Sequence, residues 1–343
     1  MLLKKFKASF LEHVLSILWG QWTGIGIPAH PSNPLKYYID PEALVFATSF
    51  FGRYEPRLFD EMLNWLDKNG TFINIQRLKN LTKPKPEIGY TPLTGQEQLH
   101  AVAGLMAERH KHQKWRRVKT ITEMYAKPEP LFFGKDGKPV TSFGKPDPLF
   151  EKYNILRGKI DFHNNTSPIR DMLDAGRILK LRALFGLGSR SEIILYLLSH
   201  SSCHPRHIAK QIFYSQKTVQ DTLVEMAESD LVRVRTSGRE KHYWIDREKW
   251  HSFLVMPEGK HDWVNWPVLF RCIQIIWLAV QEKSFHTDDR LLFSSMIREL
   301  MRKVRPGFEF AGYSDVISED SDYKGESYIP VFFSDINKLL STL

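Results

Sequence analysis

The chain has 343 residues, a length that favours two or three domains. Apolar residues make up 42% and charged residues 25%, which is typical of a globular protein with a sizeable core. The formal net charge of +9 favours an anionic partner such as nucleic acid. Only two cysteines are present, Cys203 and Cys272, so a disulfide-based scaffold is excluded and we expect a cytoplasmic protein.

Two apolar stretches superficially suggest membrane or export signals. The first twenty residues resemble a signal peptide, but Glu12 and His13 interrupt their apolar part and no small-residue cleavage site follows. The run 264–280 is the longest apolar stretch, yet Pro267 and Arg271 interrupt it and it falls short of a membrane span. We therefore expect a buried helix at 264–280 and no membrane partner.

The N-terminal part of the chain shows helical periodicity. Helices are predicted over residues 5–19, 40–51 and 56–68. Asp40 can cap the second of them, with Pro41 at its first position, and Asn69-Gly70 ends the third. We expect a helical domain over 1–82, and a second, degenerate helix-turn-helix within it is an alternative.

A linker, a basic segment and loops follow over 83–176. Residues 83–95 are predicted to be a linker, 96–126 helical, and 127–176 mostly loop with a small hairpin at Asp136-Gly137. The stretch 109–120 contains six basic residues and no acid: Arg109, Lys111, Lys114, Arg116, Arg117 and Lys119. One interpretation is a secondary nucleic-acid patch with Trp115 available for stacking. The other is a solvated helix face with Trp115 and Val118 packed inward.

The most informative stretch, 186–254, begins with two short helices, and a helix from Asp171 leads into it. Ser189 can cap the first helix, and Glu192 stands at the capping-box spacing. Pro205 fits the first position of the second helix, where its missing N–H costs nothing. The inner face of this second helix is formed by Ile208, Ala209 and Ile212.

A third helix and a hairpin complete the stretch. A turn over 213–215 leads into the helix, Ser215 can cap it, and its apolar face repeats at helical spacing: Val219, Leu223 and Met226. The period then changes to two, with one apolar and one cationic face. Val232 and Val234 alternate with Arg233 and Arg235. Ser237-Gly238 supplies a turn, after which Tyr243 and Ile245 return to the inner face.

This order of elements resembles the winged helix-turn-helix domain of bacterial ArsR- and MarR-type transcription regulators, over about a fifth of the chain. The resemblance implies that the third helix reads the DNA major groove and that the hairpin contacts phosphates. On the helix it implicates Ser215, Gln216, Lys217, Thr218, Gln220 and Asp221. On the hairpin it implicates Arg233, Arg235, Ser237, Arg239 and Lys241.

Two functions remain open at this point. Winged helices also dock proteins, and the third helix carries Asp221, Glu225 and Glu228, which would repel phosphates if they faced them. We therefore expect a DNA-binding transcription regulator with double-stranded DNA as its partner, and a protein-interaction scaffold is the alternative. A homodimer is also expected, because one reading helix covers few base pairs. The apolar segments 268–280 and 331–333 offer surfaces for it, unless they pack within one chain.

No pattern in the sequence predicts catalysis. His200, Cys203, His204 and His207 are good zinc ligands in kind, but their spacing fits no metal motif. The glycine-serine stretch 185–192 faintly resembles the start of a nucleotidyltransferase but lacks the carboxylates that hold Mg²⁺. The groups around Asp147 and the acidic cluster 315–322 form no recognisable metal site. We expect no catalytic residue, metal or cofactor, and a catalytic nucleic-acid enzyme is a third, weaker reading.

The C-terminal part is again helical in pattern, with helices predicted over 266–283, 287–304 and 329–341. The chain is therefore expected to be a mainly α, multi-domain protein with an internal winged helix. The expected divisions are 1–82, a helical domain; 83–176, the linker, basic segment and loops; 177–255, the winged helix; and 256–343, a C-terminal helical region.

Overall fold

The computed structural model describes residues 2–28, 35–110, 114–118, 127–134, 137–141, 144–238, 240–254 and 261–343, and it is mainly α-helical, as predicted. The first helices are α1 (Leu2–Gly24), α2 (Pro41–Phe51), α3 (Pro56–Asn69), α4 (Ile75–Leu81) and α5 (Gln96–His110). Strands β1 (Glu129–Pro130) and β2 (Ile155–Leu156) pair in parallel near the short α6 (Pro148–Glu151). Among the described helices, none is long and apolar enough to cross a membrane.

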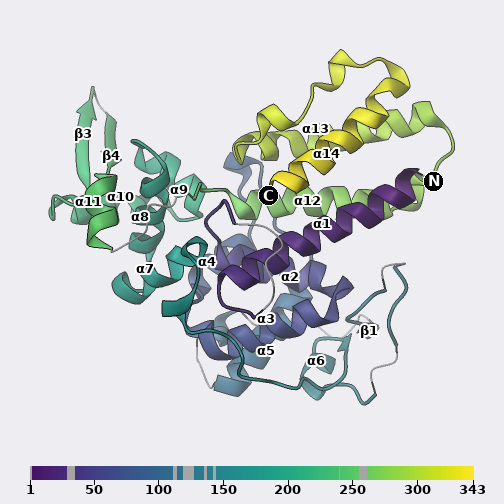
Figure 1. The fold of residues 1–343 in the computed structure, drawn as a ribbon, viewed down its shortest axis with the longest axis horizontal. Helices are drawn as coiled ribbons and strands as arrows, with labels where there is room; N and C mark the ends of the chain where they lie inside the picture. Colours follow the sequence, from purple (N-terminus) through teal and green to yellow (C-terminus); the bar gives the residue numbers. More distant parts are fainter. Residues whose placement is uncertain are drawn as a thin grey trace.

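The second half of the chain contains the elements on which the function depends. They are α7 (Arg177–Phe185), α8 (Ser189–Ser199), α9 (Pro205–Ile212), α10 (Gln216–Ala227), β3 (Arg233–Ser237), β4 (Glu240–Trp244) and α11 (Arg247–Phe253). The C-terminal helices are α12 (Trp266–Gln281), α13 (Arg290–Phe310) and α14 (Tyr328–Thr342). In Figure 1 the β3–β4 hairpin projects at one side of the molecule, and α12–α14 gather with α1 on the other.

Helix α2 lies at the centre of the fold, and all of its residues are buried. Its start is well defined, because Asp40 accepts a hydrogen bond from the backbone N–H of Ala43 (3.1 Å) and Pro41 occupies the first helical position, both as predicted. Helices α1, α3, α4, α5 and α12 contact it. Because α2 is enclosed, the polar side chain of Glu42 must find its partners inside the core.

The C-terminal apolar segments pack within the chain, which is the intrachain alternative that the sequence left open. The Phe6 ring of α1 lies 4.6 Å from that of Phe333 and 5.8 Å from that of Phe332. Phe10 stacks on Trp277 of α12 with ring centroids 5.9 Å apart. Residues 268–280 and 331–333 therefore contribute mainly to the core, and this packing uses much of the apolar surface that suggested a dimer.

Several local predictions around α7 and α8 were wrong. The helix expected from Asp171 begins at Arg177. Ser189 does not cap α8, because Gly188 is the N-cap and the Ser189 hydroxyl instead hydrogen-bonds that of Thr222 (2.7 Å). Helix α11 was missed, although Asp246 caps it by accepting from the N–H of Lys249 (3.3 Å).

The basic helical segment and the small hairpin were predicted in part. Helix α5 is described as far as His110, and Trp115–Arg117 form a 3-10 turn; residues 111–113 and 119–126 lie outside the described part. The hairpin pairing is confirmed by the antiparallel bridge between Phe133 and Pro139. Asp136, in its predicted turn, lies outside the described residues.

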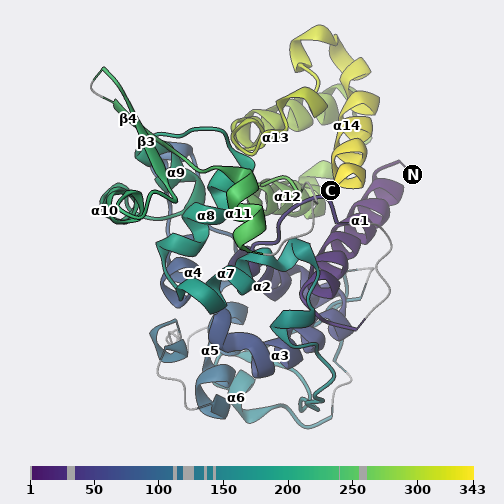
Figure 2. The same ribbon diagram turned by 60° about the vertical axis from the view of Figure 1, so that its left-hand side comes forward.

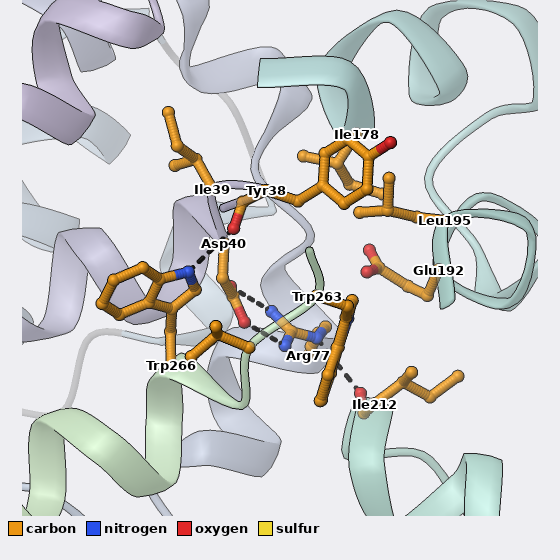
Figure 3. Close-up of a pocket in the computed structure, with 11 residues that line it drawn as sticks. Tyr38, Ile39, Asp40, Arg77, Ile178, Glu192, Leu195, Ile212, Trp263 and Trp266 are labelled. Atoms are coloured by element: carbon orange, nitrogen blue, oxygen red, sulfur yellow. Dashed lines mark hydrogen bonds and ion pairs between the residues drawn. The ribbon is translucent and has the colours of Figure 1, made fainter. Parts of the chain in front are cut away.

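A network of buried charges joins these helices (Figure 3 draws part of it). Glu42 accepts two hydrogen bonds from Arg182 (both 2.7 Å), one from Arg77 (2.9 Å), and one from the backbone N–H of Asn74 (2.7 Å). Burial alone would raise the pKa of Glu42, but Arg182 and Arg77 outweigh it and hold that pKa below its ordinary value. Glu42 is therefore ionised in the core.

The same two arginines bind two further carboxylates. Arg77 forms a bidentate pair with Asp40, and its Nε donates to the carbonyl of Ile212 (3.1 Å). Arg182 pairs with Glu192, so Glu192 is part of the core network and not of a capping box. Burial outweighs the nearby arginines and raises the pKa of Glu192. A cavity of about 10 Å³, room for about one water, lies between these groups and Trp263 (Figure 3).

Replacing Glu42 with Ala should lower the free energy of unfolding by about 3–5 kcal/mol, because it leaves two buried arginines short of their shared carboxylate. Urea unfolding of the full chain measures this change. The matched control is Glu299→Ala, which breaks the exposed pair with Lys303 (2.9 Å) and should leave the unfolding midpoint in place. Equal midpoints for the two variants would contradict the central role of the network.

Candidate nucleic-acid interface

Helices α8, α9 and α10 pack against one another as a compact unit. Pro205 occupies the first position of α9 and Ser215 caps α10 by accepting from the N–H of Thr218 (3.1 Å), both as predicted. The predicted inner faces are confirmed for α9, and for Val219 and Leu223 of α10, all of which are buried, whereas Met226 is only partly buried. The start of α10 is therefore fixed both by its own cap and by its packing.

The β3–β4 hairpin is antiparallel, with Arg233 opposite Trp244 and Ser237 opposite Glu240. Between α8 and α9, Cys203 exchanges two backbone hydrogen bonds with Tyr243 (3.0 and 2.9 Å). This isolated antiparallel bridge joins the segment between α8 and α9 to β4, and no alternating pattern around Cys203 could have predicted it. Cys203 thus has a structural position in the sheet.

Only the base of the hairpin packs on the helices. Val232, Tyr243 and Ile245 are buried as predicted, but Val234 is 46% exposed, so its predicted inward position was wrong. The reason is visible in Figures 1 and 2, where the hairpin extends beyond the helices that could cover it. Its outer part is exposed on both faces.

The exposed side chains of α10 belong mainly to its first turns. Ser215, Gln216, Lys217, Thr218 and Asp221 are exposed. Gln220 differs from them, because it is half-buried and its Nε2 donates to the Tyr243 hydroxyl (3.3 Å). Gln220 therefore holds α10 against β4 and does not project freely, which alters the role that the resemblance implied for it.

Cationic side chains follow the hairpin. Arg235 and Lys241 are exposed, as is the uncharged Ser237 near the tip; Arg239 lies outside the described residues. Arg233 is half-buried, with its guanidinium 5.2 Å from the centre of the Trp244 ring. Both views in Figures 1 and 2 place this hairpin and α10 at the same outer edge of the molecule. The cationic side chains of the hairpin and the exposed start of α10 therefore lie on the same edge of the protein.

The acidic residues of α10 begin after its first turn. Residues 215–220 contain none, and the first acid is Asp221. Glu225 pairs with Arg190 of α8, and Glu228 is exposed near the end of the helix. The negative charge that argued against DNA binding is therefore separated from the capped end of α10.

The turn before α10 is held by the N-terminal helices. Phe213 is buried in the left-handed region (φ 63°), and its carbonyl accepts from Asn80 (2.9 Å). The Tyr214 hydroxyl accepts from the side chain of Asn74 (2.6 Å). Together with the Arg77 bond to the carbonyl of Ile212, these contacts fix the direction of α10 relative to α4.

Two described residues of the secondary basic patch, Arg109 and Lys114, are bonded to other parts of the fold. Arg109 pairs with Asp67 and lies 3.7 Å over the Phe162 ring, while the Lys114 ammonium donates to the carbonyls of Thr71 (2.6 Å) and Ile73 (3.2 Å). The remaining residues divide simply: Trp115 and Val118 are buried, Arg116 and Arg117 are exposed, and Lys111 and Lys119 lie outside the described part. This geometry favours the packing interpretation of the segment.

The side chains considered above as possible metal or catalytic groups have structural contacts. His200 stacks on Tyr196 (3.8 Å between centroids), and the His204 ring accepts from the N–H of Arg206 (3.1 Å) at the start of α9. Asp147 caps α6, and Glu319 pairs with Arg305 (2.9 Å). Within the described ranges, no group of three or more His, Cys, Asp or Glu side chains is arranged to hold a metal ion.

No protein-family model, curated protein or solved structure matches the chain. The interface is therefore interpreted from its own geometry. Its described components are the exposed first turns of α10, the cations Arg235 and Lys241 and the half-buried Arg233 on the hairpin, and the contacts that fix these elements to the rest of the protein.

Lys114 should lose its charge near pH 8, because burial lowers the pKa of its ammonium to about 8. Amine acylation followed by mass spectrometry, repeated from pH 6 to 11, measures the neutral fraction at this site. The rate should reach half of its plateau near pH 8, and the signal should be absent from Lys114→Gln. A midpoint near the ordinary lysine value of about 10.4 would show that Lys114 is solvated and available to an anionic ligand.

Proposed function

We propose that residues 186–254 form a winged helix-turn-helix and that the chain binds double-stranded DNA as a transcription regulator. The observation that carries the proposal is the shared exposure, at one edge of the molecule, of the start of α10 and of a cationic hairpin. A helix of this kind fits the major groove, and a cationic hairpin beside it can contact the flanking phosphates. The backbone link between Cys203 and Tyr243 supports the proposal, because it sets the hairpin against the helices.

The first turns of α10 are the proposed reading surface. In helix-turn-helix proteins the N-terminal residues of the reading helix contact base edges. Gln216 and Lys217 are exposed there, and these side chains can pair with adenine and guanine. The positive end of the helix dipole also favours phosphate at this end of α10, whereas Asp221 and Glu228 lie farther along the helix.

A protein-docking function is the second candidate, and the far half of α10 favours it. Val224 is 44% exposed there, Leu231 just after the helix is 41% exposed, and the acidic Asp221 and Glu228 are exposed in the same part of the chain. A partner that binds this surface would carry an apolar patch and basic residues. DNA binding would use the start of α10 and protein docking its far half, so substitutions in the two halves distinguish the two functions.

Arg235→Ala and Lys241→Ala should each reduce the salt dependence of DNA binding. Loss of one phosphate contact lowers the magnitude of the slope of log K against log salt by about 0.9. Fluorescence anisotropy of a labelled duplex between 50 and 200 mM salt measures this slope.

The control is Arg302→Ala, which removes the same charge from the exposed surface of α13. The control should lower affinity only slightly and leave the slope in place. If Arg235→Ala and Lys241→Ala had the same slope as the control, the hairpin would not be a phosphate-binding element. If the protein showed no salt-dependent binding to the duplex, the docking function would be favoured.

Gln216→Ala and Lys217→Ala should relax sequence preference by about 1–3 kcal/mol at one base pair each. Selection from a random duplex library, read by sequencing, measures the preference. The comparison variant is Gln220→Ala, whose side chain is bonded to Tyr243, so it should retain the wild-type motif. An unchanged motif in the first two variants, or a motif altered only by Gln220→Ala, would assign base reading elsewhere.

Pairing of two copies on DNA is part of the same proposal, with half-sites about 34–36 Å apart or a multiple of that spacing. The apolar segments that suggested it are used in the core, so a dimer would use another surface. Light scattering of the protein with and without a duplex gives the number of chains bound, and one chain per duplex would exclude this arrangement.

A further inference from the structure

A large open groove lies between α1 and the C-terminal helices. Its volume is about 900 Å³, within the range of small-molecule binding sites. The apolar part of its lining comes mainly from aromatic residues of α12, η7 (Lys283–Phe285), α13 and α14: Trp277, Phe285, Phe293 and Phe333. In Figures 1 and 2 these helices lie on the side of the molecule away from the β3–β4 hairpin, so the groove is separate from the proposed DNA interface.

Trp277 in this lining carries a buried donor without an acceptor. The residue is 2% exposed, and its indole N–H has no hydrogen-bond partner among the residues that the structure describes. Buried tryptophan N–H groups are normally paired, because an unmade hydrogen bond in the core is costly. Trp277 is a lining residue of the groove, so a ligand whose acceptor atom reached this nitrogen would satisfy it.

The α1 wall of the groove is cationic. Lys4 and Lys7 lie three positions apart on one helix face and both line the groove. Within the described part of the chain, neither forms an ion pair, and burial lowers the pKa of Lys7, as expected for a partly desolvated cation without a counter-ion. On the opposite rim, Arg290 is already paired with Glu326 (2.8 Å). Asp288 also lines the groove, and the unpaired positive charge of the lining lies on Lys4 and Lys7 of α1.

We propose that this groove binds an amphipathic organic carboxylate, with its anionic head held by Lys7 and the Trp277 N–H and its apolar body along the aromatic lining. The head requires an acceptor and a negative charge, which a carboxylate supplies in one group. The body requires apolar surface, which the aromatic residues of the lining supply beside its polar groups. This ligand class is matched to the groove alone and is independent of the DNA-binding proposal.

Isothermal titration of the full chain with sodium decanoate, below its micelle concentration, tests the proposal. We expect saturable binding of one decanoate per chain. Acetate, which has the head without the body, and decyltrimethylammonium, which has the body with a cationic head, should not bind. These two probes separate the contributions of charge and apolar surface.

Three variants locate the site. Lys7→Ala should weaken decanoate binding about tenfold, which is the usual effect of losing one charge-assisted hydrogen bond. Trp277→Phe should weaken it several-fold while leaving the unfolding midpoint unchanged or higher, because it removes an unpaired buried donor and keeps an aromatic ring. The matched control is Lys5→Ala, an exposed lysine of the same helix that does not line the groove, and it should bind as the wild type does.

Three results would overturn the proposal. The first is equal binding of decanoate and decyltrimethylammonium, which would indicate a non-selective apolar surface. The second is equal affinity in Lys7→Ala and Lys5→Ala. The third is absence of decanoate binding together with a dimer that Lys7→Glu dissociates, which would assign the groove to a second copy of the chain.

Discussion

The ion cluster around Glu42 determines how the two halves of the protein meet. Glu42 follows the cap of α2, Arg77 comes from α4, Arg182 from α7 and Glu192 from α8. Each of these charges is buried, so displacement of any one of the helices would leave an uncompensated charge in the core. The position of α8, and through it that of α10 and the hairpin, is therefore coupled to the N-terminal helices and not only to local packing.

Predictions from the sequence were most accurate where a structural feature depends only on neighbouring residues. Asp40-Pro41, Pro205 and Ser215 favour helix starts through interactions confined to a few neighbouring residues, and α2, α9 and α10 begin where these signals predict. The order of the main helices followed from apolar periodicity, but some of their ends did not: α1 spans Leu2–Gly24 where 5–19 was predicted, and α13 spans Arg290–Phe310 where 287–304 was predicted. For the same reason, the three helices and the hairpin over 186–254 could be recognised in order before their arrangement was known.

Predictions that depended on distant partners were wrong or incomplete. Glu192 fits a capping box by spacing, yet the partner that decides its position, Arg182, is on the preceding helix and is itself held by Glu42. Gln220 lies opposite the buried stripe of α10, but the Tyr243 hydroxyl of β4 draws it inward. The alternating pattern predicted that Val234 would point inward. It is exposed, because the hairpin extends past the helices that could cover it. These outcomes require three-dimensional contacts that no local pattern contains.

The turn at Phe213 and Tyr214, which the N-terminal helices hold, means that the 177–255 region is not structurally independent of the rest of the chain. In an excised fragment, Phe213 would lose its edge-to-face contact with Tyr90, whose centroid lies 4.9 Å away, and the bond from Asn80 to its carbonyl would be broken. Arg182 would remain with Glu192 but without Glu42. Grafting this region onto another protein would therefore expose the Phe213 ring and the Arg182–Glu192 pair, so the start of α2, α4 and Tyr90 belong to its smallest transplantable form.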